Sequence, residues 1–238
     1  MQASSGAPLS DAGEQAALPA SVQVAGADLA PWPHGQSVAP LSAPLMAVTT
    51  FADHGDYHPA LIAAALAAES DSRFRDRTFR GACGTKVRRI SAWSDPSATL
   101  VHGRALMLAH HTLSRQAVFA DDSWGSVYRA GDYCMPHSHL RSNASIVYML
   151  DPGDDDPDEP LAGKLCFADS RIAACCPHEP GRVTRHLMPS MTPGTMIIFA
   201  SDYLHSVNPY RGRRPRITLS WNVTLSRLPG RPGEGWQK

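Results

Sequence analysis

The chain has 238 residues, which is enough for one well-filled domain with some residues left over. Its 22 Lys and Arg residues balance its 22 Asp and Glu residues, so there is no general electrostatic attraction to nucleic acid or to an anionic membrane. The five cysteines are odd in number and form no C-x-x-C pair, and no stretch reaches the length of a membrane span. We therefore expect a cytoplasmic protein that binds neither nucleic acid nor membrane.

The first 44 residues are rich in Ala, Ser, Pro and Gly and show no sustained apolar period. Such a segment buries too little surface to offset the entropy of ordering it, so we expect disorder over 1–44. A folded domain is expected over 45–228, with its core at 124–223. The last residues, 229–238, are expected to form a frayed tail.

Two helices are predicted ahead of this core. Apolar residues recur at helical spacing over 58–70, where Pro59 suits the first turn, and again over 98–118. Between the helices, residues 74–93 mix Arg with aromatic and turn-forming residues. We expect a solvated loop or a lid there, of a composition that would suit an anionic or aromatic compound or a peptide.

From Trp124 onward the sequence changes to short apolar runs that are separated by turn signals. The runs have strand length and strand composition, and they cover 125–129, 145–150, 164–168, 195–200 and 216–223. Many short strands after a helical prelude predict a mainly β fold. The expected architecture is a double-stranded β-helix of the jelly-roll or cupin-like kind, with the N-terminal helices covering one side.

His137 and His139 are one residue apart in this region. Alternate side chains of an extended chain share a face, so both imidazoles would point the same way. His205 follows the apolar run 195–200 and is the best candidate for a third ligand from a neighbouring strand. Three ligands would leave open positions on a metal, which non-heme iron oxygenases need for co-substrate and O2.

Arg216 opens a predicted strand whose alternate residues are polar: Arg216, Thr218, Ser220 and Asn222. A polar face of this kind suits the interior of a ligand-binding barrel. A guanidinium there can hold a carboxylate through two parallel hydrogen bonds. The sequence therefore predicts a cation in the same cavity as the histidines.

Several short motifs occur in a fixed order between residues 124 and 223. They are Tyr128-x-x-Gly131-x-Tyr133, Pro136-His137-x-His139, Gly163-Lys-Leu-x-Phe, Pro193-Gly194-x-x-x-x-Phe199, His205 and Arg216-Ile-Thr-Leu-Ser-Trp-Asn222. As an ordered set they resemble a family of 2-oxoglutarate/Fe(II)-dependent oxygenases and, more distantly, the prolyl hydroxylases.

This resemblance implies a double-stranded β-helix in which His137, His139 and His205 hold Fe(II). Arg216 would grip the distal carboxylate of 2-oxoglutarate, and Tyr128, Tyr148 and Asn222 are carried over as further co-substrate contacts. The enzyme would oxidise a small molecule or a peptide with O2, releasing succinate and CO2. A homodimer is left open.

One feature departs from the superfamily pattern, which has His-x-Asp or His-x-Glu where this chain has His137-Ser138-His139. A carboxylate lowers the charge of an iron site and an imidazole does not. Two alternatives therefore stay open. One is a three-histidine dioxygenase of cupin type that does not use 2-oxoglutarate; the other is a non-catalytic barrel that binds a metal or a small molecule. Asp169, on a different predicted segment, is expected to lie outside the ligand set.

Overall fold

A computed structural model describes residues 19–42, 45–76, 84–113, 118–139, 141–175 and 185–225. The eight-stranded antiparallel sheet has the order β3-β4-β11-β9-β13-β7-β6-β5, and a three-stranded sheet has the order β10-β12-β8. The strands of the large sheet are β3 (Ala39–Ser42), β4 (Met46–Thr50), β5 (Arg75–Asp76), β6 (Thr85–Arg88), β7 (Phe119–Tyr128), β9 (Ala144–Asp151), β11 (Thr195–Ala200) and β13 (Arg216–Thr224). Those of the small sheet are β8 (Cys134–His137), β10 (Leu165–Phe167) and β12 (His205–Val207). The mainly β prediction is confirmed.

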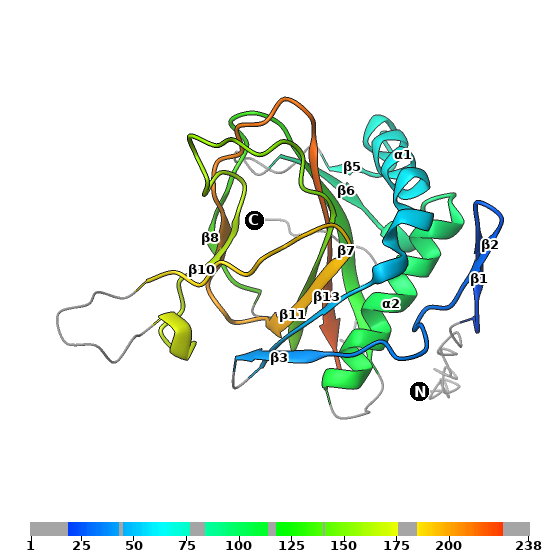
Figure 1. Cartoon of the computed structure of the whole chain (residues 1–238), viewed down its shortest axis with the longest axis horizontal. Helices are drawn as coiled ribbons and strands as arrows, with labels where there is room; N and C mark the ends of the chain where they lie inside the picture. Colours follow the sequence, from blue (N-terminus) through cyan, green and yellow to red (C-terminus); the bar gives the residue numbers. More distant parts are fainter. Residues whose placement is uncertain are drawn as a thin grey trace, which may run out of the picture.

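Helices α1 (His58–Ser70) and α2 (Pro96–Thr112) cover one face of the large sheet, while β8 and β10 lie on its other side (Figure 1). The first helix has the predicted bounds. The second begins two residues earlier than predicted, because Asp95 caps it by accepting a hydrogen bond from the backbone N–H of Ser97 at 2.8 Å. It also ends at Thr112, six residues before the predicted end at 118. Neither helix is long and apolar enough to cross a membrane, within the part of the chain that is described.

The two faces of strand β13 have different surroundings. Ile217, Leu219, Trp221 and Val223 belong to the apolar core between the sheet and the helices. The alternate residues Arg216, Thr218 and Ser220 line a cavity between the two sheets. The predicted division of this strand into an apolar and a polar face is thus confirmed, and it determines which residues can reach a ligand.

The segment expected to lack order contributes three short strands over its described part. Strands β1 (Val22–Val24) and β2 (Ala27–Leu29) form a hairpin, and β3 pairs with β4. Val24 is 3 % exposed, and the indole of Trp32 packs edge-on against Phe51 at 5.8 Å between ring centroids. A few large apolar side chains anchor this otherwise polar segment. Residues 1–18 and the predicted tail lie outside the described residues.

The stretch predicted as a solvated loop or lid, 74–93, contains two strands instead. Strand β6 pairs with β7 along its whole length, and Val87 is fully buried. Strand β6 buries its two middle residues and half-buries the residues at its ends, so it shows no alternation of apolar and polar residues that could have predicted a strand. Residues 77–83 lie outside the description.

Candidate functional site

Three imidazoles meet inside the cavity between the sheets. His137 ends β8 and His205 begins β12, and these two residues are directly paired across the small sheet. His139 follows β8, where its backbone N–H donates to the carbonyl of Ser201 at 2.6 Å. The ring centroids are 4.3 Å apart for His137 and His205, 5.0 Å for His137 and His139, and 5.2 Å for His139 and His205. One ligand atom from each ring lies within 4.8 Å of the others, which is suitable for one metal ion.

Backbone carbonyls orient two of the rings. The Nδ1 of His137 is 2.8 Å from the carbonyl oxygen of Met135, and the Nδ1 of His205 is 2.9 Å from that of Tyr203. A carbonyl only accepts, so Nδ1 must carry the proton in each ring and Nε2 keeps its lone pair. This is the usual way in which a protein fixes the tautomer of a metal-binding histidine.

The third ring is held by a side chain. The Nδ1 of His139 lies 3.3 Å from the amide of Asn222, and that amide is also 3.0 Å from the hydroxyl of Ser145. The amide nitrogen, which only donates, faces Nδ1, and the amide oxygen accepts from Ser145, so Nδ1 is the acceptor in this orientation. With the amide reversed, its oxygen would accept a hydrogen bond from Nδ1–H and leave the lone pair of Nε2 for a metal. Asn222 was predicted to contact the co-substrate. In the structure it contacts an imidazole and a serine, and it is not among the residues that line the cavity.

Burial favours the neutral form of all three rings. Desolvation lowers the pKa of His205 to about 3 and lowers those of His137 and His139, and the neighbouring imidazoles add to the effect for His139 and His205. Neutral imidazole is the form that binds a transition metal. The donor set therefore fits Fe(II), as it fits other metals that accept nitrogen ligands.

Arg216 lies at one end of the same cavity and is 3 % exposed. It is paired with Tyr128 across β13 and β7, and its guanidinium carbon is 5.3 Å from the centre of the Tyr128 ring. Its Nη1 is buried without a hydrogen-bond partner among the described residues. Burial lowers the pKa of Arg216, and Tyr128 and Tyr210 offset this in part. An unpaired buried guanidinium is costly unless a ligand completes its hydrogen bonds.

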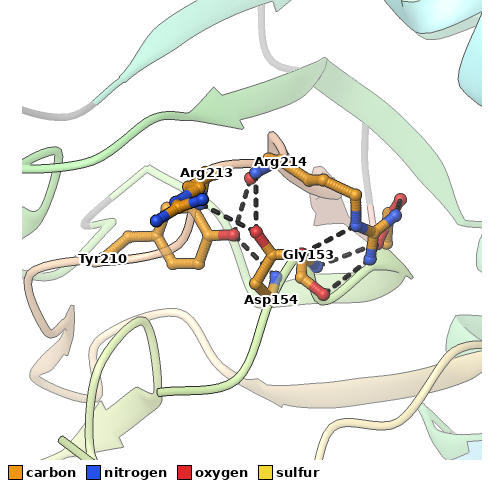
Figure 2. A network of polar contacts seen from close by, with 6 residues as sticks. Gly153, Asp154, Tyr210, Arg213 and Arg214 are labelled. Atoms are coloured by element: carbon orange, nitrogen blue, oxygen red, sulfur yellow. Dashed lines mark hydrogen bonds and ion pairs between the residues drawn. The ribbon is translucent and has the colours of Figure 1, made fainter.

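The loop before Arg216 is tied to the loop after β9 (Figure 2). The carboxylate of Asp154 accepts hydrogen bonds from the backbone N–H groups of Arg213 and Arg214, at 2.8 Å each, and from Nε of Arg214 at 2.8 Å. The Tyr210 hydroxyl accepts from the N–H of Asp154 at 2.8 Å and donates to the carbonyl of Arg214 at 2.6 Å. We call these four residues the Asp154 clamp. The clamp fixes the backbone from which Arg216 starts.

Tyr148, which was predicted to contact the co-substrate, lies on the face of β9 that points away from the cavity. Its hydroxyl is 2.6 Å from that of Tyr57 and also contacts Nε2 of His58, both on the helical side of the sheet. Side chains alternate along β9, so Ser145 and Val147 reach the cavity while Tyr148 belongs to the core beneath α1.

The lining of the cavity includes two side chains that sequence reasoning missed, Lys86 and Trp124. Lys86 lies in a segment that carried no recognised motif, and Trp124 lies four residues before Tyr128, the first residue of the motifs. Asp169 lies outside the metal group, as expected: its carboxylate accepts from Arg171 and from the backbone N–H of Leu204, next to His205. It therefore supports the turn that presents His205.

Residues 122–222 match the family model described as "Putative 2OG-Fe(II) oxygenase". A comparison with curated proteins gave no match. Many solved structures are similar in fold.

One is the epimerase SnoN in complex with Fe3+, alpha ketoglutarate and nogalamycin RO, at 15 % identity over 81 % of this chain and 89 % of that chain, with a TM-score of 0.55. Another is AviO1 from Streptomyces viridochromogenes Tue57, at 14 % identity over 80 % of this chain and 92 % of that chain, with a TM-score of 0.53. A third is a prolyl hydroxylase from Trichoplax adhaerens in complex with a peptide fragment of hypoxia inducible factor, at 12 % identity, 79 % and 83 % coverage and a TM-score of 0.51. At these identities the likeness is one of fold.

Proposed function

Because the chain belongs to the 2OG-Fe(II) oxygenase family through residues 122–222, we propose that it hydroxylates a small molecule or a peptide with O2 while converting 2-oxoglutarate to succinate and CO2. We assign Fe(II) to His137, His139 and His205. We assign the distal carboxylate of 2-oxoglutarate to Arg216, with Tyr128 beside it.

One observation carries this proposal: three convergent imidazoles and a buried guanidinium with an unpaired Nη1 line the same cavity. The imidazoles can bind a metal but not an anion, whereas the guanidinium can bind a carboxylate but not a metal. A ligand that joins the two must chelate a metal at one end and carry a carboxylate at the other. 2-Oxoglutarate has both properties.

The chain's own residues have three tasks in this reaction. The carbonyls of Met135 and Tyr203 and the amide of Asn222 orient the imidazole rings, and one ligand nitrogen of each ring then lies close enough to the others for one metal ion. Arg216 positions the co-substrate by its far end. Apolar side chains that line the cavity, Leu165, Phe199 and Val207, limit the access of water. The iron, when bound, supplies the oxidative chemistry.

The test is an anaerobic titration of the purified protein with Fe(II) and then 2-oxoglutarate. We expect the weak visible charge-transfer band of an iron–keto acid chelate in the wild type. His139→Ala should weaken iron binding, because one of three ligands is lost. His34→Ala is the matched control, since His34 is exposed and remote from the metal group, and it should behave as the wild type.

Two other results would redirect the assignment. If iron binds and no band develops, the absence of a carboxylate ligand favours a three-histidine dioxygenase that attacks a bound substrate directly. If iron does not bind to the protein, oxygenase chemistry at this site is refuted, and a barrel that binds another metal or a small molecule takes its place.

A further inference from the structure

The side chain of Asn222 is buried beside the metal group, on β13, where the residue is 5 % exposed. It lies opposite Ser145 of β9, and Ser145 in turn contacts Ser201, which follows β11. The hydroxyl oxygens of Ser145 and Ser201 are 2.9 Å apart, and both residues are buried. Strands β9, β11 and β13 thus position a short hydrogen-bonded chain that ends at the ring of His139.

The direction of each hydrogen bond in this chain follows from the amide. Ser145 donates to the Oδ1 of Asn222 at 3.0 Å, so the Nδ2 of Asn222 donates to the Nδ1 of His139 at 3.3 Å. A neutral imidazole whose Nδ1 accepts must carry its proton on Nε2. His139 therefore has the opposite tautomer from His137 and His205, whose Nδ1 atoms donate to backbone carbonyls.

The two tautomers of His139 suit two states of the protein, without and with a metal ion. Each Nδ1 of the three histidines has a partner that does not line the cavity, so Nε2 is the nitrogen that each ring leaves for a metal. One ligand atom of each ring lies within 4.8 Å of the others. Without a metal, three lone pairs directed at one point repel one another, and a proton on one nitrogen relieves this repulsion. With a metal, the same nitrogen must present its lone pair.

The change of tautomer requires the amide of Asn222 to reverse. Its oxygen then accepts from Nδ1–H of His139, and its nitrogen donates to the hydroxyl oxygen of Ser145. A hydroxyl group both donates and accepts, so Ser145 can serve either orientation by turning its proton toward Ser201. The number of hydrogen bonds among the four residues is therefore the same in both arrangements.

We propose that Asn222 is a positioning residue for the metal: its amide reverses when a metal binds, and this recruits His139 as the third ligand beside His137 and His205. The inference rests on the proposed function in that it places a metal ion on these histidines, but it does not depend on the co-substrate. The protein without a metal thus offers two ready ligands and one that must change its tautomer.

Anaerobic titration of the metal-free protein with Fe(II) alone, and separately with Zn(II) alone, tests this role. Asn222→Leu keeps a side chain of similar size but offers no hydrogen bond, so metal affinity should fall about 10- to 100-fold. Asn222→Asp only accepts, and it can accept from both Ser145 and His139. It holds the proton of His139 on Nδ1 in advance, so the metal should bind more tightly than to the wild type. A side chain that only fills space would give a lower affinity in both variants, and that result would overturn the proposal.

The same two substitutions at Asn208 are the matched controls. Asn208 donates to the carbonyl of Leu161 and lies outside both the cavity lining and the metal group. Asn208→Leu and Asn208→Asp should therefore bind Fe(II) and Zn(II) as the wild type does.

Long-range 1H–15N correlation spectra of the histidine rings report which nitrogen carries the proton. The signals of His139 are identified by their loss in His139→Gln. In the metal-free wild type the proton should be on Nε2 of His139, whereas in the zinc-loaded wild type and in metal-free Asn222→Asp it should be on Nδ1. An Nδ1 proton in the metal-free wild type, or unchanged metal affinity in Asn222→Leu, would overturn the proposal.

The charge-transfer band with 2-oxoglutarate separates this inference from the proposed function. Metal binding that depends on Asn222 without any band in the wild type would refute the proposed function and leave the role of Asn222 standing. A band in the wild type together with unchanged metal affinity in Asn222→Leu would refute only the role of Asn222. A wild type that binds neither Fe(II) nor Zn(II) would refute both.

Discussion

Replacing Arg216 by Met should make the protein more stable and less able to bind its co-substrate. The guanidinium is 3 % exposed, its Nη1 has no partner among the described residues, and burial lowers its pKa. A buried charged group that lacks a partner costs free energy in the folded state. Met keeps the unbranched stem of the side chain and lacks the charged guanidinium, so it removes this cost.

The expected changes in the free energy of unfolding and in the affinity for 2-oxoglutarate follow from two sets of hydrogen bonds: those that Arg216 lacks in the free protein and those that the co-substrate would make with it. A buried polar group without a partner costs about 1–3 kcal/mol, so the free energy of unfolding of the ligand-free variant should rise by about this amount. For a domain of this size, each kcal/mol corresponds to about 2–4 °C in Tm. Two charge-assisted hydrogen bonds to a carboxylate would be lost, so 2-oxoglutarate should bind about 100-fold more weakly or worse.

Thermal melts with and without Fe(II) and 2-oxoglutarate, under argon, measure both effects on one sample. The wild type should gain Tm on adding 2-oxoglutarate, and Arg216→Met should start higher and gain little. Arg216→Lys is the control, because it keeps a cation and should keep part of the ligand effect. A variant that melts lower than the wild type and still responds fully to 2-oxoglutarate would refute the reasoning.

Three further expectations address residues away from the metal. Burial lowers the pKa of His102 from 6.5 to about 4, so between these pH values the unfolded chain binds a proton that the folded chain does not. The free energy of unfolding should therefore fall by about 3 kcal/mol as the pH is lowered from 6.5 to 4. His102→Gln, which can still accept a hydrogen bond from Trp221, should abolish this part of the pH dependence in urea titrations at several pH values. Tyr148→Phe should cost about 1–2 kcal/mol of stability by removing a buried hydrogen bond and leave 2-oxoglutarate affinity unchanged; a loss of affinity would return Tyr148 to the site. Gly153→Ala should lower Tm, because φ is +75° and the new Cβ would lie 2.0 Å from the Tyr210 hydroxyl; an unchanged Tm would mean that the Asp154 clamp has room to move.

The sequence was sufficient to predict an element where its apolar residues recur regularly over many positions, and to predict the site where motifs occur in a fixed order. The helix over 58–70, the two faces of β13 and the meeting of His137, His139 and His205 all followed from spacing. In the helix and in β13 a run of several residues repeats the same local signal, and the histidines belong to motifs that occur in a fixed order. The cavity therefore contains five of the seven residues that were predicted for it: the three histidines, Arg216 and Tyr128.

The rest depended on contacts between distant segments. Tyr148 and Asn222 are near the site in sequence, but strand register turns the first toward the helices and brings the second under His139. Lys86 reaches the cavity only because β6 pairs with β7, and nothing in a four-residue strand between Gly84 and Arg89 indicates that pairing. The hairpin at 22–29 is held by contacts with the rest of the molecule that its own composition does not predict.

The Asp154 clamp also limits how this end of the protein can change by mutation. The Tyr210 hydroxyl lies 2.0 Å and 2.1 Å from the places where side chains at Gly153 and Gly212 would begin. Each glycine is therefore replaceable only together with the tyrosine, and a smaller residue at 210 alone would leave the clamp without its two hydrogen bonds to Asp154 and Arg214. The three positions form an epistatic set, so a single substitution at 153, 210 or 212 should destabilise the loop that precedes Arg216 and be removed by selection. New substrate specificities should therefore arise from changes elsewhere in the cavity lining, where Lys86 and Trp124 lie.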